Sequence, residues 1–340
     1  RSTQAKTLFP YTTLFRSVGS VAEVNQVLRV GRFERTFEAE LAARYGDIPS
    51  LPDGTAAAEF LSRCGGDFRA VISAGPRGVD VATMDGLPNL GAIVNIGAGV
   101  DAIDLGAAAA RGIGVSNTPD VLSDTVADTA LGLMLMTLRR FGAAERYARE
   151  GRWSVEGPFG YGRDLTGARV GILGLGRIGQ AIATRVLGFG CAIAYHNRRR
   201  VDGCAYRYVE SARELAAEVD VLVVATTGDG ARPLVDREVL EALGPGGYLI
   251  NIARGSVVDE GALITVLAEG GLAGAGLDVF ADEPNIPAAL RYSDNVVVFP
   301  HIGSATERTR RAMAQLAIRN LDSYLTTGEL VTPVLQSGPA

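Results

Sequence analysis

The chain has 340 residues, of which 47% are hydrophobic, and its 33 Lys and Arg residues against 38 Asp and Glu residues give a net charge of −5. That length is enough for two domains of ordinary size, and the lack of a long basic tract argues against nucleic acid or a membrane surface as a partner. Three widely spaced cysteines and two histidines (His196 and His301) argue against a disulfide framework and a metal site, so we expect a cytoplasmic protein without a metal.

Residues 1–17 contain Thr-Leu-Phe twice and lack the continuous apolar core of a secretion signal. We expect them to be either linker-derived sequence or a disordered natural tail. No stretch of the sequence approaches the ~18 uninterrupted apolar residues of a membrane span.

Strands and helices alternate through the first third of the chain. Strands are predicted at 24–30, 70–74, 90–96 and 113–116, and helices at 33–45, 56–64, 79–87 and 105–111. Alternation at this spacing is typical of parallel βαβ units. We therefore predict a flavodoxin-like domain, which carries no nucleotide fingerprint of its own.

A single long helix is predicted next, from Asp120 to Trp153, with Asp120 or Ser123 as its N-cap. Apolar residues between 131 and 138 cover most of its circumference. Because a helix that is apolar on all sides needs partners on all sides, we expect it to be buried within one subunit or inserted into another.

A second alternating series follows and predicts a doubly wound parallel sheet of six strands. The strands are expected at 170–173, 192–195, 221–225, 248–252, 274–279 and 295–299, with helices at 181–189, 211–217, 236–243, 259–270 and 287–291. Ligands of such sheets bind outside the carboxyl ends of the strands. The polar residues at those ends are therefore the candidates for function.

The first strand of this series runs into the glycine-rich sequence GLGRIG at 174–179 and then into a helix. In a dinucleotide-binding turn Gly174 makes the tight turn, Gly176 lets a pyrophosphate approach the backbone, and Gly179 allows close helix–strand packing. Arg177 and Ile178 begin the helix whose free N–H groups would meet the phosphates. A glycine-rich turn without a nucleotide is the alternative.

The next strand ends in His196-Asn197-Arg198-Arg199-Arg200. An NAD-binding domain usually places an acidic residue here for the ribose 2′-hydroxyl. Arginine suits a phosphate and a carboxylate would repel one, so we predict NADP(H) in preference to NAD(H), bound by Asn197, Arg198 and Arg199. A solvated basic turn is the alternative.

Three further strand ends carry Arg254, Glu283 and His301. Each is more often structural when met alone, but together beside a nicotinamide they could reduce a 2-oxo acid. Arg254 would bind the carboxylate and carbonyl oxygen, His301 would donate a proton to the developing alkoxide, and Glu283 would orient the imidazole and favour its charged form.

Four motifs in this order resemble those of the D-isomer-specific 2-hydroxyacid dehydrogenases, especially the NADPH-dependent glyoxylate/hydroxypyruvate reductases. They lie at 174–179, 251–255, 276–284 and 300–306, and the similarity runs from about residue 18 to 333. The resemblance implies that Arg254, Glu283 and His301 are catalytic. It further implies substrate contacts at Ala98, Gly99, Arg254 and Ser304, a nicotinamide contact at Asp278, and further cofactor contacts at Thr226, Thr227, Ile252 and Gly303.

The resemblance also implies a discontinuous fold with the active site in the cleft between two domains. The substrate domain would comprise 18–118 and 301–335, and the NADP-binding Rossmann domain 119–300. Members of this family form homodimers through the long helix, here 120–152. Many members have Pro-Leu-Thr where this chain has Thr226-Thr227-Gly228, which puts the cofactor contacts there in doubt.

Two other functions remain open. Corepressors share this fold, so a non-catalytic nucleotide-sensing protein is one alternative, and a reductase of larger aryl pyruvates is another. The missing acid after the second strand disfavours 3-phosphoglycerate dehydrogenase, and the Glu–His arrangement disfavours formate dehydrogenase. Small substrates such as glyoxylate and hydroxypyruvate are predicted.

Overall fold

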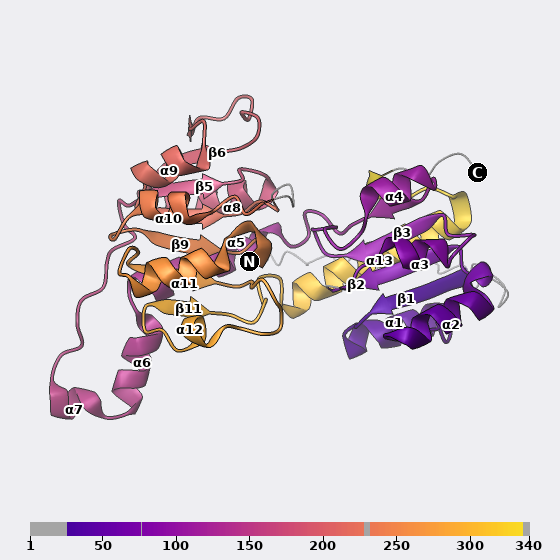
Figure 1. Cartoon of the computed structure of the whole chain (residues 1–340), viewed down its shortest axis with the longest axis horizontal. Helices are drawn as coiled ribbons and strands as arrows, with labels where there is room; N and C mark the ends of the chain where they lie inside the picture. The colour runs from indigo at the N-terminus through magenta and orange to yellow at the C-terminus, as the bar shows by residue number, and fades with distance from the viewer. Residues whose placement is uncertain (1–25, 76, 228–231, 336–340) are drawn as a thin grey trace, which may run out of the picture.

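The computed structural model describes residues 26–75, 77–227 and 232–335 and has two lobes, each built on its own mainly parallel sheet (Figure 1). Residues 1–17, for which a linker or a tail is predicted, lie outside the described residues. The predicted α/β class, with one mainly parallel sheet in each of two units, is thus confirmed. Within the described part of the chain, no helix combines the length and apolar character needed to cross a membrane.

The sheet of the first lobe contains β1 (Val27–Gly31), β2 (Ala70–Ala74), β3 (Ala92–Ile96) and β4 (Gly114–Ser116), which run parallel in that order. Ser50 adds a parallel bridge on the free side of β1, through Arg29. Counting that bridge as a strand gives the order 2-1-3-4-5 of flavodoxin-like sheets. A short antiparallel strand that the sequence did not predict, β12 (Pro333–Leu335), pairs with β4 at the other edge.

Five helices surround this sheet: α1 (Arg35–Tyr45), α2 (Thr55–Cys64), α3 (Val81–Asp85), α4 (Leu105–Ala110) and α13 (Glu307–Thr327). The last of these comes from the end of the chain yet returns to the first lobe, where it packs against α1, β2 and β3 (Figure 1). Ala317 and Leu321 of α13 are fully buried with Val27 and Ile72 of the sheet. The core of the first lobe is therefore made from both ends of the chain.

The sheet of the second lobe has seven parallel strands where six were predicted. They are β5 (Arg169–Leu173), β6 (Ala192–His196), β7 (Arg207–Tyr208), β8 (Val221–Val224), β9 (Tyr248–Asn251), β10 (Gly274–Leu277) and β11 (Val296–Val298). Their order is β11-β10-β9-β8-β5-β6-β7. Strands β6 and β7 lie on one side of β5, and β8 to β11 lie on the other, so the strand order switches between β5 and β8. This is the switch point at which doubly wound sheets bind their ligands. The additional strand, β7, has only two residues, too few for a periodic signal.

Helices cover both faces of this sheet. One face is covered by α5 (Ser123–Leu138) and α8 (Arg177–Leu187), and the other by α9 (Ala212–Glu218), α10 (Arg237–Leu243) and α11 (Glu260–Ala268). The short helix α12 (Ala288–Arg291) precedes β11. Strand β8 shows why the layers form: Val221 and Val223 face one core, Leu222 and Val224 face the other, and all four are fully buried.

The prediction of one long helix from Asp120 to Trp153 is wrong, because the segment forms three helices. After α5 the chain turns at Arg140, which has a left-handed φ of 53°, before α6 (Phe141–Arg149) and α7 (Arg152–Glu156). The carbonyl of Leu138 accepts the amide of Arg163 at 2.8 Å, a tertiary contact at the break. Figure 1 shows α6 and α7 as an arm that projects from the second lobe.

The predicted N-cap of this helix is also wrong. The cap position is Leu122, whose side chain makes no capping bond. Asp120 lies outside the helix with φ 67° and pairs with Arg177 at 2.7 Å instead. One side of α5 is buried in the second lobe, whereas Leu131 and Leu135 are only half-buried.

Candidate functional site

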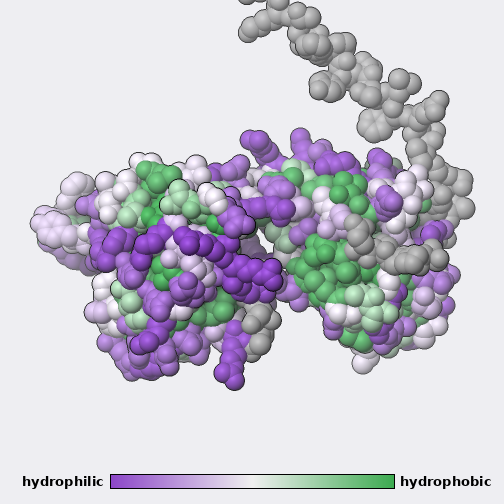
Figure 2. Space-filling model, turned by 90° about the horizontal axis from the view of Figure 1, so that it is seen from above, coloured by the Kyte–Doolittle hydropathy of each residue, from purple (hydrophilic) through white to green (hydrophobic). Residues whose placement is uncertain are grey.

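Arg254, Glu283 and His301 lie at the carboxyl ends of β9, β10 and β11, which are neighbours in the sheet. The parallel register places those ends on one edge, because the carboxyl ends of parallel strands meet at the same side of a sheet. This edge faces the first lobe, and a recess lies between the lobes in the space-filling view (Figure 2).

His301 and Glu283 form a direct pair. The Nδ1 of His301 lies 2.7 Å from Oε2 of Glu283, and the amide of Phe280 donates to the other carboxylate oxygen at 3.1 Å. Burial alone would raise the pKa of the Glu283 carboxyl, but the hydrogen bond and charge of His301, with the Phe280 amide and Arg254, bring it below its ordinary value. Glu283 is thus held as a carboxylate, and Nε2 of His301 is left for other partners.

Asp278 fixes the loop that carries His301. Its buried carboxylate accepts the amides of Ile302 at 2.7 Å and Gly303 at 2.8 Å, while its carbonyl accepts the amide of His301 at 2.9 Å. These bonds hold His301 at a left-handed φ of 53°, which is uncommon for a residue other than glycine. Burial raises the pKa of Asp278 although the two amides act against it. Both of its oxygens serve this loop, and the nicotinamide contact implied for Asp278 stays a prediction.

Arg254 is positioned by Asn251 and Gly255. The buried side chain of Asn251 donates from its Nδ2 to the carbonyl of Arg254 at 2.9 Å, and its Oδ1 accepts the backbone N–H of Ala253 at 3.0 Å. A Cβ at Gly255 would overlap the backbone of Phe280. Because glycine allows this close approach, the turn of Arg254 lies beside the segment that leads to Glu283.

The guanidinium of Arg254 reaches across to the first lobe. Its Nε lies 2.9 Å from Oδ2 of Asp101, and a Cβ at Gly99 would overlap its Nη2. Ala98 and Gly99, predicted to hold the substrate carboxylate, are therefore beside Arg254. Ser304 lies half-buried in the His301 loop. Asp101 was assigned no role from the sequence, since nothing local marks a partner 153 residues away.

The glycine turn has the geometry that a dinucleotide requires. Gly174 adopts φ 102°, and a Cβ there would lie 2.7 Å from the carbonyl oxygen of Ala225 and from Cβ of Thr226. A Cβ at Gly179 would overlap the carbonyl oxygen of Gly174, whereas one at Gly176 would meet no described heavy atom within 4 Å. The turn is thus tightly packed at its base and open where a pyrophosphate would approach, so these residues fit the cofactor.

The other predicted cofactor residues surround this turn. The side-chain oxygen of Asn197 accepts the amide of Leu175 at 2.6 Å, which ties the end of β6 to the glycine turn. Arg198 and Arg199 are exposed, and no hydrogen bond or ion pair joins either to another described residue. Arg177, at the start of α8, pairs with Asp120. Ile252 is buried at the end of β9, and Thr227 is exposed after β8.

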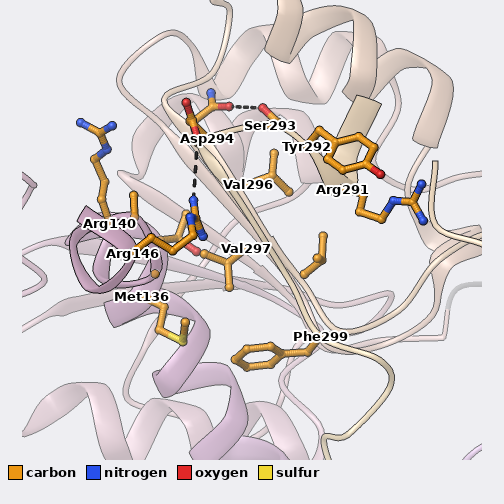
Figure 3. Close-up of a pocket in the computed structure, with 15 residues that line it drawn as sticks. Met136, Arg140, Arg146, Arg291, Tyr292, Ser293, Asp294, Val296, Val297 and Phe299 are labelled. Carbon is orange, nitrogen blue, oxygen red and sulfur yellow. Dashed lines mark hydrogen bonds and ion pairs between the residues drawn. The ribbon is translucent and has the colours of Figure 1, made fainter. Parts of the chain in front are cut away.

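A separate cavity of about 370 Å³ lies away from this site, between α5, α6 and β11 (Figure 3). Val296, Val297 and Phe299 give it an apolar wall, and Arg146 approaches Asp294 at 3.8 Å across it. None of the predicted site residues lines this cavity. It adjoins α6 at the base of the arm and lies outside the candidate site.

Comparisons with known proteins identify the family to which the chain is similar. Residues 131–303 match the family model described as D-isomer specific 2-hydroxyacid dehydrogenase, NAD binding domain. Glyoxylate/hydroxypyruvate reductase A HPR2 of Arabidopsis thaliana is 46% identical over 269 residues, which cover 79% of this chain and 86% of the relative. Hydroxyphenylpyruvate reductase of Plectranthus scutellarioides is 44% identical over 278 residues, covering 82% and 88%.

Solved structures show the same likeness across both lobes. An NADPH-dependent glyoxylate/hydroxypyruvate reductase from Sinorhizobium meliloti, in complex with NADP and malonate, superposes with a TM-score of 0.85 at 42% sequence identity. The match covers 93% of this chain and 99% of that protein.

Proposed function

Because this chain belongs to the D-isomer-specific 2-hydroxyacid dehydrogenase family, we propose that it reduces small 2-oxo acids, such as glyoxylate and hydroxypyruvate, to D-2-hydroxy acids with NADPH. The observation that carries this proposal is the 2.7 Å pair of His301 and Glu283 on strand ends next to that of Arg254. The names of the reductases from Arabidopsis thaliana and Sinorhizobium meliloti support the same reaction.

The residues of the site have distinct tasks in this reaction. NADPH, bound at the glycine turn, would supply the hydride. Arg254 and the amides near Gly99 bind the carboxylate of the 2-oxo acid, and Arg254 also stabilises charge on its carbonyl oxygen. That oxygen takes a proton from Nε2 of His301, since Nδ1 is engaged by Glu283. Glu283 fixes the tautomer and stabilises the protonated imidazole.

The first test is the decay of absorbance at about 340 nm with glyoxylate, using NADPH and NADH in turn. Rapid decay with NADPH alone supports both the reaction and the cofactor preference. Decay with NADH alone would keep the reaction and overturn the preference. No decay with either cofactor across several 2-oxo acids would favour the non-catalytic nucleotide-sensing alternative.

The preference for NADPH rests on Arg198 and Arg199, which are exposed at the end of β6 and make no hydrogen bond or ion pair with another described residue. A 2′-phosphate would lie beside them. We expect their joint replacement by alanine to raise the KM for NADPH about 100-fold or more, because charge-assisted hydrogen bonds contribute about 1.5–3 kcal/mol each and both arginines are removed. The KM for NADH should change little. Equal losses with both cofactors would show that these arginines do not bind the phosphate.

A second candidate is the reduction of aryl pyruvates. The 44% identity to a hydroxyphenylpyruvate reductase favours it specifically. Measuring kcat/KM for glyoxylate and for 4-hydroxyphenylpyruvate side by side decides between them. A higher value for the aromatic substrate would replace the small-substrate proposal.

We also propose that the chain forms a homodimer through 120–152. We further propose that one lobe is a domain made of 18–118 and 301–335, and that the other lobe is a domain made of 119–300. The projecting arm supports the first proposal, since Trp153 is 69% and Val155 85% exposed on α7. Large apolar side chains exposed together on a protruding element are typical of interfaces. The packing of α13 on β2 and β3 supports the second.

A further inference from the structure

Each of the three carbonyls of 97–99, the loop beside Arg254, accepts one hydrogen bond from within the first lobe. The amide of Thr118 donates to Gly97 at 2.9 Å, the side chain of Asn117 donates to Ala98 at 2.6 Å, and the side chain of Asn95 donates to Gly99 at 2.8 Å. Three successive carbonyls are thereby fixed from the same lobe.

This arrangement determines where the amides point. In a trans peptide the N–H lies opposite the preceding carbonyl, and none of the three bonds that follow these carbonyls is cis. The N–H groups of Ala98, Gly99 and Val100 therefore point away from the donors that hold the loop. None of them donates to another described residue. Successive free N–H groups of this kind form a concavity that binds anions.

The donor for the central carbonyl is itself held by the end of the chain. Thr332 donates its hydroxyl to the carbonyl of Asn117 at 2.6 Å and accepts the amide of Asn117 at its own carbonyl at 3.4 Å. The fully buried Asn320 of α13 binds Thr332 twice, each time at 2.9 Å. A hydrogen-bonded relay thus runs from Asn320 through Thr332 and Asn117 to Ala98.

We propose that Thr332 and Asn117 are positioning residues for the substrate carboxylate. They orient the Ala98 carbonyl and so aim the Gly99 amide into the recess, which couples the C-terminal segment to substrate binding. This inference rests on the proposed function, because it concerns the loop that would bind the 2-oxo acid. Asn117 and Thr332 make no contact with the reacting atoms in this scheme.

The test replaces the Thr332 hydroxyl without changing the size of the side chain. We expect Thr332→Val to weaken binding of malonate to the NADP⁺-loaded protein about threefold to tenfold, the effect of one neutral hydrogen bond. The KM for glyoxylate should rise by a similar factor while kcat at saturation stays within about twofold. Isothermal titration calorimetry measures the first quantity without turnover.

Two variants serve as matched controls. Thr332→Ser keeps the hydroxyl and should restore malonate affinity. Thr327→Val makes the same change near the end of α13, where the hydroxyl donates only to the carbonyl of Ser323 and accepts the amide of Glu329, and should leave affinity unchanged.

The possible outcomes separate the relay from the function. A lower melting temperature with unchanged malonate affinity would show a structural role for Thr332 and overturn the proposal. Failure of the original protein to bind malonate would overturn it too. Weaker malonate binding by Thr332→Val in a protein that reduces no 2-oxo acid would support the relay and refute the proposed function.

Discussion

His301 is placed by two carboxyl groups whose pKa values are shifted in opposite directions. The Glu283 carboxylate accepts hydrogen bonds from the imidazole and from a backbone amide, and its pKa lies below the ordinary 4.5. Asp278 is more deeply buried, binds backbone amides only, and has a raised pKa. Glu283 therefore supplies the negative charge that the imidazole needs, whereas Asp278 shapes the backbone on which the imidazole is held.

The ionised state of Glu283 has a consequence for the pH dependence of reduction. Glu283→Gln removes the charge that stabilises the protonated imidazole, so we expect kcat to fall about 100-fold or more. The acid limb of the kcat/KM profile, which protonation of the Glu283 carboxylate would set below its ordinary pKa, should be absent from the variant, since a glutamine amide does not titrate. A pH series with glyoxylate and NADPH measures both effects.

Asp282→Asn provides the matched control for this prediction. It removes a neighbouring carboxylate that is exposed and accepts only from Asn285 among the described side chains. Its pH profile should coincide with that of the unaltered protein. A Glu283→Gln profile that also coincides would contradict the role of Glu283.

The sequence predicts the residues of the site where their position on a strand identifies them. Arg254, Glu283 and His301 follow recognisable strands, and the parallel sheet brings them to one edge. Asp101, Asn117 and Thr332 could not be found in this way, because their roles depend on bonds to residues far away in the sequence.

At the scale of elements, strands that carry an apolar run were predicted, whereas segments defined only by backbone pairing were not. Strand β8 is a run of four buried residues that only a two-sided sheet accommodates. In contrast, β7, β12 and the bridge at Ser50 are defined by a few backbone bonds to neighbours. The break at Arg140 belongs to the same class, since the helical pattern continues there and neither Arg139 nor Arg140 is a glycine or proline.

The glycine turn between β5 and α8 allows the structural and ligand-binding roles of glycine to be separated. Gly176→Ala places a methyl group where no described atom lies within 4 Å, so the melting temperature should stay within about 2 °C. Its KM for NADPH should rise at least tenfold, since the methyl group would meet the pyrophosphate. Differential scanning fluorimetry and initial rates measure the two quantities.

Gly179→Ala is the paired variant and should behave in the opposite way. The added methyl group overlaps the carbonyl oxygen of Gly174, so α8 must move away from β5. We expect a loss of about 1–3 kcal/mol in the free energy of unfolding, as for other overpacked sites. Normal cofactor binding by Gly176→Ala would refute the placement of the pyrophosphate.

At the scale of the whole molecule, the chain crosses between the lobes near 117–122 and again near 299–307. Two contacts also join the lobes. Arg254 forms an ion pair with Asp101, and the hydroxyls of Thr125 and Thr309 are hydrogen-bonded at 2.7 Å. The recess between the lobes therefore has the predicted substrate loop on one wall and the His301–Glu283 pair on the other. A relative movement of the lobes would change the distance between them.

The exposed arm leads to a prediction about assembly. If α6 and α7 cover a second copy, Trp153→Asp should convert a dimer into a monomer, because a charge replaces a large apolar contact. Light scattering after size-exclusion chromatography measures the mass. Tyr292→Asp is the informative comparison, since Tyr292 is 76% exposed and lines the cavity beside the arm. A monomeric unaltered protein would contradict the dimer.

The discontinuous first lobe also imposes an order on biosynthesis. Chains emerge from the ribosome N-terminus first, yet the core around β1–β4 includes Ala314, Ala317 and Leu321. The lobe that is translated first is accordingly completed last, after the whole nucleotide-binding lobe has been made. Thr332 arrives later still, so a nascent chain that stops short of it acquires the glycine turn and the His301–Glu283 pair while its predicted substrate loop lacks this support.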